Sequence, residues 1–182
     1  GGTLTRVPNI SGNAAFNDLV ITLTGTYGLT ATASTLYAPP STLFNITAAT
    51  AASLAWVQQP TTTTAGSVIT PSVTVRVLDA YLNPVSGISV SVTTTNGTAI
   101  SGTLVTQTNS SGIATFNNLS ITLTGSYALS ASASTLYAPP STLFNITSST
   151  VNLSNPGGGT WAYSRPITIA NTSSVITDYQ CL

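Results

Sequence analysis

Residues 16–47 read FNDLVITLTGTYGLTATASTLYAPPSTLFNIT, and residues 116–147 read FNNLSITLTGSYALSASASTLYAPPSTLFNIT. The two stretches are offset by 100 positions, and from Ala33 and Ala133 onward they match without exception. A period near 100 residues is too long for a solenoid repeat and is typical of a tandem array of β-sandwich domains. The repeat therefore predicts several sandwich domains in a row.

The same offset predicts the domain boundaries. Because residues 2–4 align with residues 102–104, we interpret residues 1–48 as the second half of a repeat. Its first half is missing or is supplied by a neighbour. Residues 49–148 are expected to form a complete domain. Residues 149–182 do not repeat the opening of that domain, and we expect a linker followed by the start of a third β domain or a donor-strand tail.

Alternation of apolar and polar residues predicts strands rather than helices in residues 49–148. The alternating apolar positions are Val73, Val75, Val77, then Ile88, Val90, Val92, then Leu119, Ile121, Leu123, then Tyr127, Leu129, Ala131 and Ala133. Turn signals separate these runs, among them Asn83-Pro84, Asn96-Gly97 and Ser111-Gly112. About seven short strands at regular spacing predict an all-β fold of two-sheet Greek-key type.

The shortage of charge excludes several classes of function. Only 3% of the residues are charged, and they are Arg6, Arg76, Arg165, Asp18, Asp79 and Asp178. Three scattered arginines cannot form the basic surface that nucleic-acid binding requires. Thr, Ser or Asn interrupts every apolar stretch, so a transmembrane segment is not expected either.

The residue types needed for catalysis are also missing. The chain has no His, Lys or Glu, so a serine nucleophile would lack a base and general acid–base chemistry would lack its usual groups. We therefore expect no enzyme activity, no cofactor and no metal centre. Asp79 is expected to accept backbone N–H groups of the turn that follows it. The alternative for Asp79 is a calcium site, although such sites normally gather several carboxylates.

A neutral surface with so little charge is tolerable if glycan covers it or an assembly buries it, and both point outside the cell. Eight asparagines precede X-Ser/Thr and are candidates for N-glycosylation: Asn9, Asn45, Asn96, Asn109, Asn118, Asn145, Asn152 and Asn171. Coincidence in a Ser/Thr-rich chain is the alternative. Some of these asparagines are expected to face inward or to sit in strands, so only a subset would be modified. The single cysteine, Cys181, is interpreted as a small buried apolar residue, with an intermolecular disulfide as the alternative.

The ordered motifs of residues 52–147 resemble the bacterial and archaeal immunoglobulin-like repeats of surface adhesins of the invasin and intimin type. The resemblance is carried by Leu54-Ala55-Trp56, Val75-Arg76-Val77-Leu78-Asp79, Asn83-Pro84-Val85, Gly112-Ile113-Ala114-Thr115-Phe116, Gly125-Ser126-Tyr127 and Phe144-Asn145-Ile146. Such repeats often have glycine where this chain has Leu82. The resemblance implies an immunoglobulin-like fold and a place on the cell surface.

Four aromatic residues are expected to have structural roles in these repeats. Trp56 and Phe116 are expected to fill the core. Tyr27 and Tyr127 stand where a tyrosine corner would tie a strand end to an upstream backbone group. The stretch from Trp161 to Asn171 is similar to the opening of a domain of unknown function found in archaeal and bacterial surface proteins. The glycines at 157–159 before it are typical of a hinge-like linker.

These observations predict a structural subunit or repeat segment of an extracellular filament, pilus or adhesin stalk. Self-association is expected, and a neighbouring subunit could complete the first repeat by strand addition. The alternative is that this half repeat belongs to a longer polypeptide. A second candidate function is a carbohydrate- or host-surface-binding module, for which Tyr37, Tyr81, Tyr137 and Tyr163 could form an aromatic platform. The identical Pro-Pro context of Tyr37 and Tyr137 instead favours a repeated contact between domains.

Overall fold

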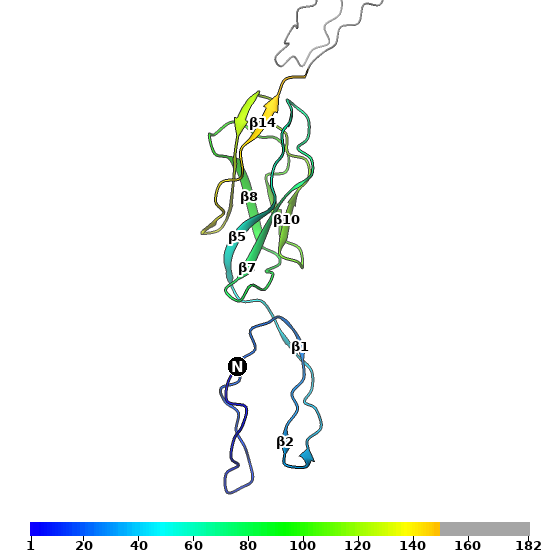
Figure 1. Ribbon diagram of the computed structural model, residues 1–182, viewed down its shortest axis with the longest axis vertical. Helices are drawn as coiled ribbons and strands as arrows, with labels where there is room; N and C mark the ends of the chain where they lie inside the picture. Colours follow the sequence, from blue (N-terminus) through cyan, green and yellow to red (C-terminus); the bar gives the residue numbers. More distant parts are fainter. Residues whose placement is uncertain (150–182) are drawn as a thin grey trace, which may run out of the picture.

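The computed structural model describes residues 1–149, and every regular element within them is a β-strand. This confirms the all-β class, which follows from a sequence rich in the β-branched residues that pack well on a pleated surface. The first repeat unit (residues 1–48) and the second repeat unit (residues 49–148) follow one another along the long axis of the molecule (Figure 1).

The second repeat unit is a two-layer immunoglobulin-like sandwich. One sheet has the antiparallel order β10-β7-β5, and the other layer contains the sheets β13-β12-β8-β9 and β11-β14-β6. The strands are β5 (Ala51–Gln58), β6 (Thr63–Thr64), β7 (Val73–Asp79), β8 (Ser89–Thr94), β9 (Val105–Gln107), β10 (Ile113–Phe116), β11 (Gly125–Tyr127), β12 (Leu129–Ala133), β13 (Leu136–Tyr137) and β14 (Phe144–Thr147). Because β7 and β8 lie in opposite layers, and β10 and β12 do likewise, the chain crosses between the layers in the Greek-key manner.

The core lies between these two layers. On β7 the valines at 73, 75 and 77 are fully buried, as their alternation predicts. They face a layer to which β8 contributes Val90 and Val92 and β12 contributes Leu129. Each side chain of this size stabilises the fold by about 1.5–3 kcal/mol when it is fully buried. The sandwich of residues 49–148 therefore has a continuous hydrophobic core.

One predicted strand is wrong. The alternation at Leu119, Ile121 and Leu123 predicts a strand, but this segment has no continuous ladder. The Leu119 carbonyl accepts a hydrogen bond from Ile69, and the Ile121 carbonyl accepts one from Gly66. The segment runs between β10 in one sheet and β11 in the other layer, so its backbone groups cannot keep register with a single neighbour.

The first repeat unit contains only the strands of the second half of the fold. They are β1 (Gly25–Tyr27), β2 (Thr32–Ala33), β3 (Leu36–Tyr37) and β4 (Phe44–Ile46). The pairing of β1 with β4 has the same register as that of β11 with β14. Residues 1–48 have no counterpart of β5, β7 or β8. The counterpart of β12 is accordingly shortened to the two residues of β2, because the strand that would pair with it is lacking.

Candidate functional site

The junction between the two repeat units is the first distinctive site, and a single side-chain amide bridges it. The Asn83 Oδ1 atom accepts a hydrogen bond from the backbone N–H of Thr24 at 3.0 Å. The Asn83 Nδ2 atom donates to the Thr22 carbonyl at 2.7 Å. The side chain of Asn83 is buried, although it lies in the loop that follows β7. The amide thus pairs with the backbone of the other repeat unit as a neighbouring strand would.

The Asp79 carboxylate organises this junction. Its Oδ1 atom accepts hydrogen bonds from the backbone N–H groups of Tyr81 at 2.8 Å and Asn83 at 2.9 Å, which confirms the predicted turn. Its Oδ2 atom accepts from the Asn83 side chain at 2.9 Å and from the N–H of Ala49, the first residue of the second repeat unit, at 2.9 Å. All of these partners are N–H donors. They occupy the carboxylate in the way expected of a structural group rather than a calcium ligand.

The hydrogen bonds of Asp79 also set its ionisation. Desolvation by burial acts to raise its pKa, but the hydrogen bonds from the Asn83 side chain and from the backbone of Ala49, Asn83 and Tyr81 outweigh it. They lower the pKa from 3.8 to about 2. The carboxylate is therefore charged at every physiological pH. Within residues 1–149, no three His, Cys, Asp or Glu side chains gather in the way that a metal ion would require.

The second distinctive site is the open face of the first repeat unit, an apolar inner surface that lacks a covering sheet. Leu29 is 44% exposed, whereas Leu129 at the same place in the second repeat unit is 0% exposed. Phe16 is 41% exposed, whereas Phe116 is 1% exposed. A concave part of this face is lined by Gly1, Leu4, Leu19, Val20, Ile21, Leu29, Phe44 and Ile46.

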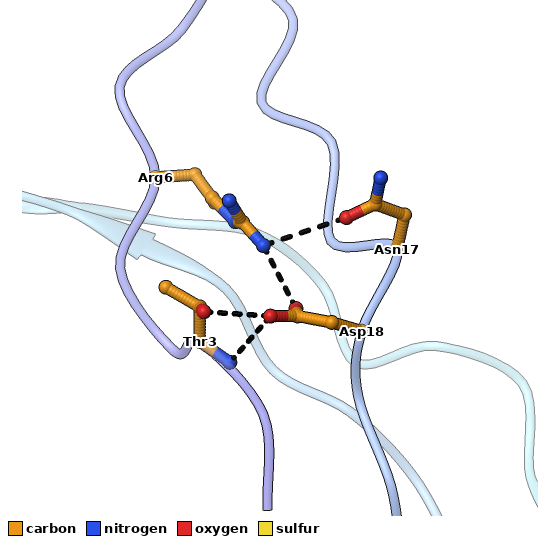
Figure 2. A network of polar contacts seen from close by, with 4 residues as sticks. All are labelled: Thr3, Arg6, Asn17 and Asp18. Atoms are coloured by element: carbon orange, nitrogen blue, oxygen red, sulfur yellow. Dashed lines mark hydrogen bonds and ion pairs between the residues drawn. The ribbon is translucent and has the colours of Figure 1, made fainter.

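A polar network near the chain start ties two segments of the first repeat unit together (Figure 2). The Asp18 carboxylate accepts hydrogen bonds from the backbone N–H of Thr3 at 3.1 Å and from its hydroxyl at 2.6 Å. It also pairs with Arg6 at 2.9 Å, and Arg6 in turn donates to Asn17. The hydroxyl of Thr3 first, and then Arg6, lower the pKa of Asp18.

The second repeat unit shows that this network is structural. The Asn118 Oδ1 atom accepts from the Thr103 N–H at 2.8 Å, and the Asn118 Nδ2 atom donates to the Thr103 hydroxyl at 3.0 Å. An uncharged amide thus makes the same link that Asp18 makes in the first repeat unit. The charge of Asp18 is not needed for that link, and the exposed ion pair with Arg6 adds little because water screens it.

The structural aromatic residues fall into two groups. Phe116 and Tyr127 are buried, whereas Tyr27 and Trp56 are only partly buried. The Tyr127 hydroxyl donates to the Leu123 carbonyl at 2.9 Å, and Tyr27 makes the equivalent bond to Leu23 at 3.0 Å. Tyr27 is more exposed because no second sheet covers it.

Trp56 differs from the expected core filler. It lies at the edge of the core, and its indole N–H donates to the Pro139 carbonyl at 2.7 Å. An indole buried at the centre of the sandwich would need a polar partner there, which the apolar core does not offer. Trp56 therefore links β5 to the segment after β13.

The exposed tyrosines do not form one platform. Tyr37 and Tyr137 are 80% and 75% exposed, and each belongs to the short hairpin of its own repeat unit. Tyr81 is 57% exposed and lies in the junction loop. Tyr37 lies away from the described junction, because its partner strand β2 lies at the end of the first repeat unit that points away from the second (Figure 1). Its contact with another repeat unit stays a prediction. Tyr163 lies outside the described residues.

All six sequon asparagines within the described residues are exposed: Asn9, Asn45, Asn96, Asn109, Asn118 and Asn145. None of these six faces inward, but Asn45 and Asn145 sit in strands, which agrees with the expectation that some would face inward or sit in strands. The inner positions of the strands are taken by apolar side chains, which leaves the polar sequon residues on the outside. Asn152 and Asn171, Cys181 and the predicted linker and third domain lie outside the described residues.

The comparisons with known proteins give limited similarity. No family model matches the sequence, and no curated protein matches it. Similar solved structures include the D0-D1 domain of intimin, with 21% identity, a TM-score of 0.39 and coverage of 69% of this chain. The chain spans 64% of the length of that protein. For the D00-D0 domain of intimin the identity is 19%, the TM-score is 0.37, and the coverage is 79% of this chain and 78% of that one.

No helix within residues 1–149 is long and apolar enough to cross a membrane.

Proposed function

We propose that this chain is a non-enzymatic segment of an extracellular, cell-surface stalk or filament. The observation that carries the proposal is the direct bond between successive repeat units, in which Asn83 of one pairs with Thr22 and Thr24 of the other. Such a bond fixes how one sandwich follows the next. Repeats joined in this way set the length and direction of a stalk.

We also propose that residues 49–148 fold as one domain and that the first repeat unit is completed by strands equivalent to β5, β7 and β8. In the second repeat unit these strands cover the positions that the open face leaves exposed. Covering Phe16 and Leu29 alone would contribute a few kcal/mol, at about 25 cal/mol per Å² of apolar surface. The strands come from preceding residues of a longer polypeptide or from another subunit by strand addition.

N-linked glycans are the proposed solubilising coat in place of charge. The exposure of all six described sequon asparagines supports this role. Asn118 is expected to be the least modified of them, because its Nδ2 atom, to which glycan would be attached, already donates to Thr103. Intact-mass and glycopeptide mass spectrometry of the native protein tests the coat. Unmodified asparagines at every sequon would contradict it.

A binding module is the less favoured function. The exposed tyrosines that could stack on a sugar, Tyr37, Tyr81 and Tyr137, lie on separate elements. A carbohydrate platform normally needs several aromatic faces side by side, and the ring pairs found among residues 1–149, Tyr27 with Phe44 and Tyr127 with Phe144, include none of these three tyrosines.

Electron microscopy of the native material tests the proposed function. A stalk or filament should appear as long thin particles whose axial repeat matches the length of one sandwich. Continuous density for a single chain through the first repeat unit would identify a longer polypeptide, and density entering from another subunit would identify strand addition. Dispersed compact particles bearing a bound ligand would contradict the structural role.

A further inference from the structure

The receiving side of the junction is a short stretch of backbone that occurs twice in the chain. In the first repeat unit, residues 21–25 read Ile-Thr-Leu-Thr-Gly, and the Thr22 carbonyl and the Thr24 N–H point to Asn83. The chain bends at Leu23, between these two residues, and both backbone groups lie within hydrogen-bond distance of the same side chain. A single carboxamide can therefore satisfy both groups, because it carries an acceptor and a donor together.

Residues 121–125 have the same sequence and the same local geometry. The Tyr127 hydroxyl binds the Leu123 carbonyl as the Tyr27 hydroxyl binds the Leu23 carbonyl. Gly25 and Gly125 adopt nearly the same φ, at 154° and 152°. The tyrosine thus holds both stretches in one conformation.

Among residues 1–149, no segment covers this second stretch. Thr122 and Thr124 are exposed, and within residues 1–149 no side chain docks on them. Leu123 between them is 57% exposed.

On the other side of the junction, residues 79–83 form the docking loop, and hydrogen bonds to Asp79 hold it in one conformation. Asp79 binds the backbone N–H and the side chain of Asn83, so the amide is held in place before it meets its partner. The same carboxylate binds the N–H of Ala49, so it also fixes the chain where the second repeat unit begins. Preorganisation of this kind lowers the entropy lost on docking.

We propose that residues 121–125 are a docking surface for a following immunoglobulin-like sandwich, one that carries Asp at the end of its counterpart of β7 and Asn four positions later. The partner chemistry is specific, because Asp or Ser in place of the asparagine cannot donate to the Thr122 carbonyl and accept from the Thr124 N–H in the same geometry. The inference rests on the proposed stalk function, since it describes how one repeat is attached to the next.

Backbone amide hydrogen exchange, followed by nuclear magnetic resonance in the full 182-residue chain, tests whether the Asn83 side chain protects the Thr24 N–H. Thr24 and Thr124 are a matched pair, because they share the same local sequence and, within residues 1–149, a side-chain amide docks on Thr24 alone. Thr24 should exchange about tenfold more slowly than Thr124. Asn83→Ala should remove the difference and leave Thr124 unchanged. Equal exchange rates at Thr24 and Thr124 in the unmodified chain would show that Asn83 does not hold the Thr24 N–H, and would overturn the inference.

A lengthened chain tests the docking surface itself. A second copy of residues 49–148 is inserted after Ser148, which supplies a sandwich with its own Asp-Asn loop. The Thr124 amide should then exchange about tenfold more slowly than in the 182-residue chain. Replacing the inserted copy of Asn83 with Ala should reverse this effect, and Asn83→Ala in the original copy should not.

The comparison of Thr124 exchange in the unmodified and lengthened chains uses no substitution. Its result therefore does not depend on whether an Asn83→Ala variant folds. Unchanged exchange at Thr124 after lengthening would overturn the inference. Filaments seen by microscopy together with unchanged exchange would reject this docking surface and leave the stalk function standing.

Discussion

Leu82 shows how far the junction loop depends on hydrogen bonds made by its neighbours. Its φ of 68° lies in the left-handed region, where a non-glycine residue costs roughly 1–2 kcal/mol. Its side chain is 74% exposed and recovers little of that cost by packing. The conformation persists because Asp79 binds the N–H groups of Tyr81 and Asn83 on either side of it. The strain is therefore the cost of placing Asn83 at the junction.

Leu82→Gly is expected to stabilise the protein. Glycine removes the left-handed strain but is more flexible in the unfolded chain, so the free energy of unfolding should rise by roughly 0.5–1 kcal/mol. Urea unfolding of the full chain measures the change. Leu82→Ala is the control, because it removes the same exposed side chain and keeps the strain. An equal effect of both variants would show that strain at Leu82 is not the cause.

The low pKa of Asp79 predicts how stability depends on pH. A carboxyl whose pKa falls from 3.8 unfolded to about 2 folded contributes stability that is complete above pH 4. This contribution is lost as the pH falls from about 4 to about 2. The thermal midpoint of the wild type should fall across that range, and Asp79→Asn should have a lower midpoint at neutral pH and a weaker pH dependence.

Asp18→Asn is the control for this pH effect. The pKa of Asp18 is also lowered, but its link to Thr3 should survive as an amide, as Asn118 shows. The Asp18 variant should therefore keep most of the fall between pH 4 and pH 2. A wild-type midpoint that is flat over this range would contradict the role of Asp79.

At the scale of the elements, the turns at Gly97 and Gly112 differ in how closely they pack against neighbouring strands. Gly112 and Gly97 both have positive φ, at 71° and 75°, and both belong to turns that the sequence predicts. Only Gly112 also lies against another element. A Cβ atom there would lie 2.6 Å from the Val77 carbonyl oxygen and 3.1 Å from Pro84, whereas a Cβ at Gly97 would meet nothing within 4 Å. The turn before β10 is thus packed against the end of β7.

The two glycines provide a matched pair of substitutions. Gly97→Ala should lower the free energy of unfolding by about 1 kcal/mol through backbone strain alone. Gly112→Ala should lower it by roughly 2–4 kcal/mol, since overpacking against β7 adds to the strain. Urea unfolding of the two variants measures the difference. Similar losses would show that the close approach to Val77 has no energetic consequence.

At the scale of the whole molecule, the two repeat units share a sequence but not an environment. Leu29 and Leu129 occupy the same place in the repeat, and one is half exposed while the other is fully buried. The difference arises because β5, β7 and β8 cover the second repeat unit alone. The same residue type at the same place in the repeat therefore contributes differently to the free energy of unfolding in the two repeat units.

Truncating these two leucines measures the difference directly. Leu129→Ala should cost about 2–5 kcal/mol of unfolding free energy because it leaves a cavity in a packed core. Leu29→Ala in the same chain should cost less than about 1 kcal/mol. In a chain preceded by a copy of residues 49–100, Leu29→Ala should become as costly as Leu129→Ala. Equal losses in the unmodified chain would show that the first repeat unit is already closed.

The sequence by itself determined the class of the fold. The 100-residue repeat and the alternation on β7 and β8 are local patterns, and burial of one side of each strand follows from them directly. The same pattern failed at Leu119, Ile121 and Leu123, because alternation reports which side is buried and not which strand is the neighbour. Asp79 was predicted as a turn residue from its local context.

Only the tertiary structure decided the junction. Asn83 looked like an ordinary turn residue, and its bond to Thr24 joins positions that are 59 residues apart. The exposure of Phe16 and Leu29 was also decided at this level, because it depends on strands that residues 1–48 do not contain. The alternation of apolar and polar residues is a property of the local sequence. Which strands pair and which side chains are buried depend on the segments that the folded chain brings into contact.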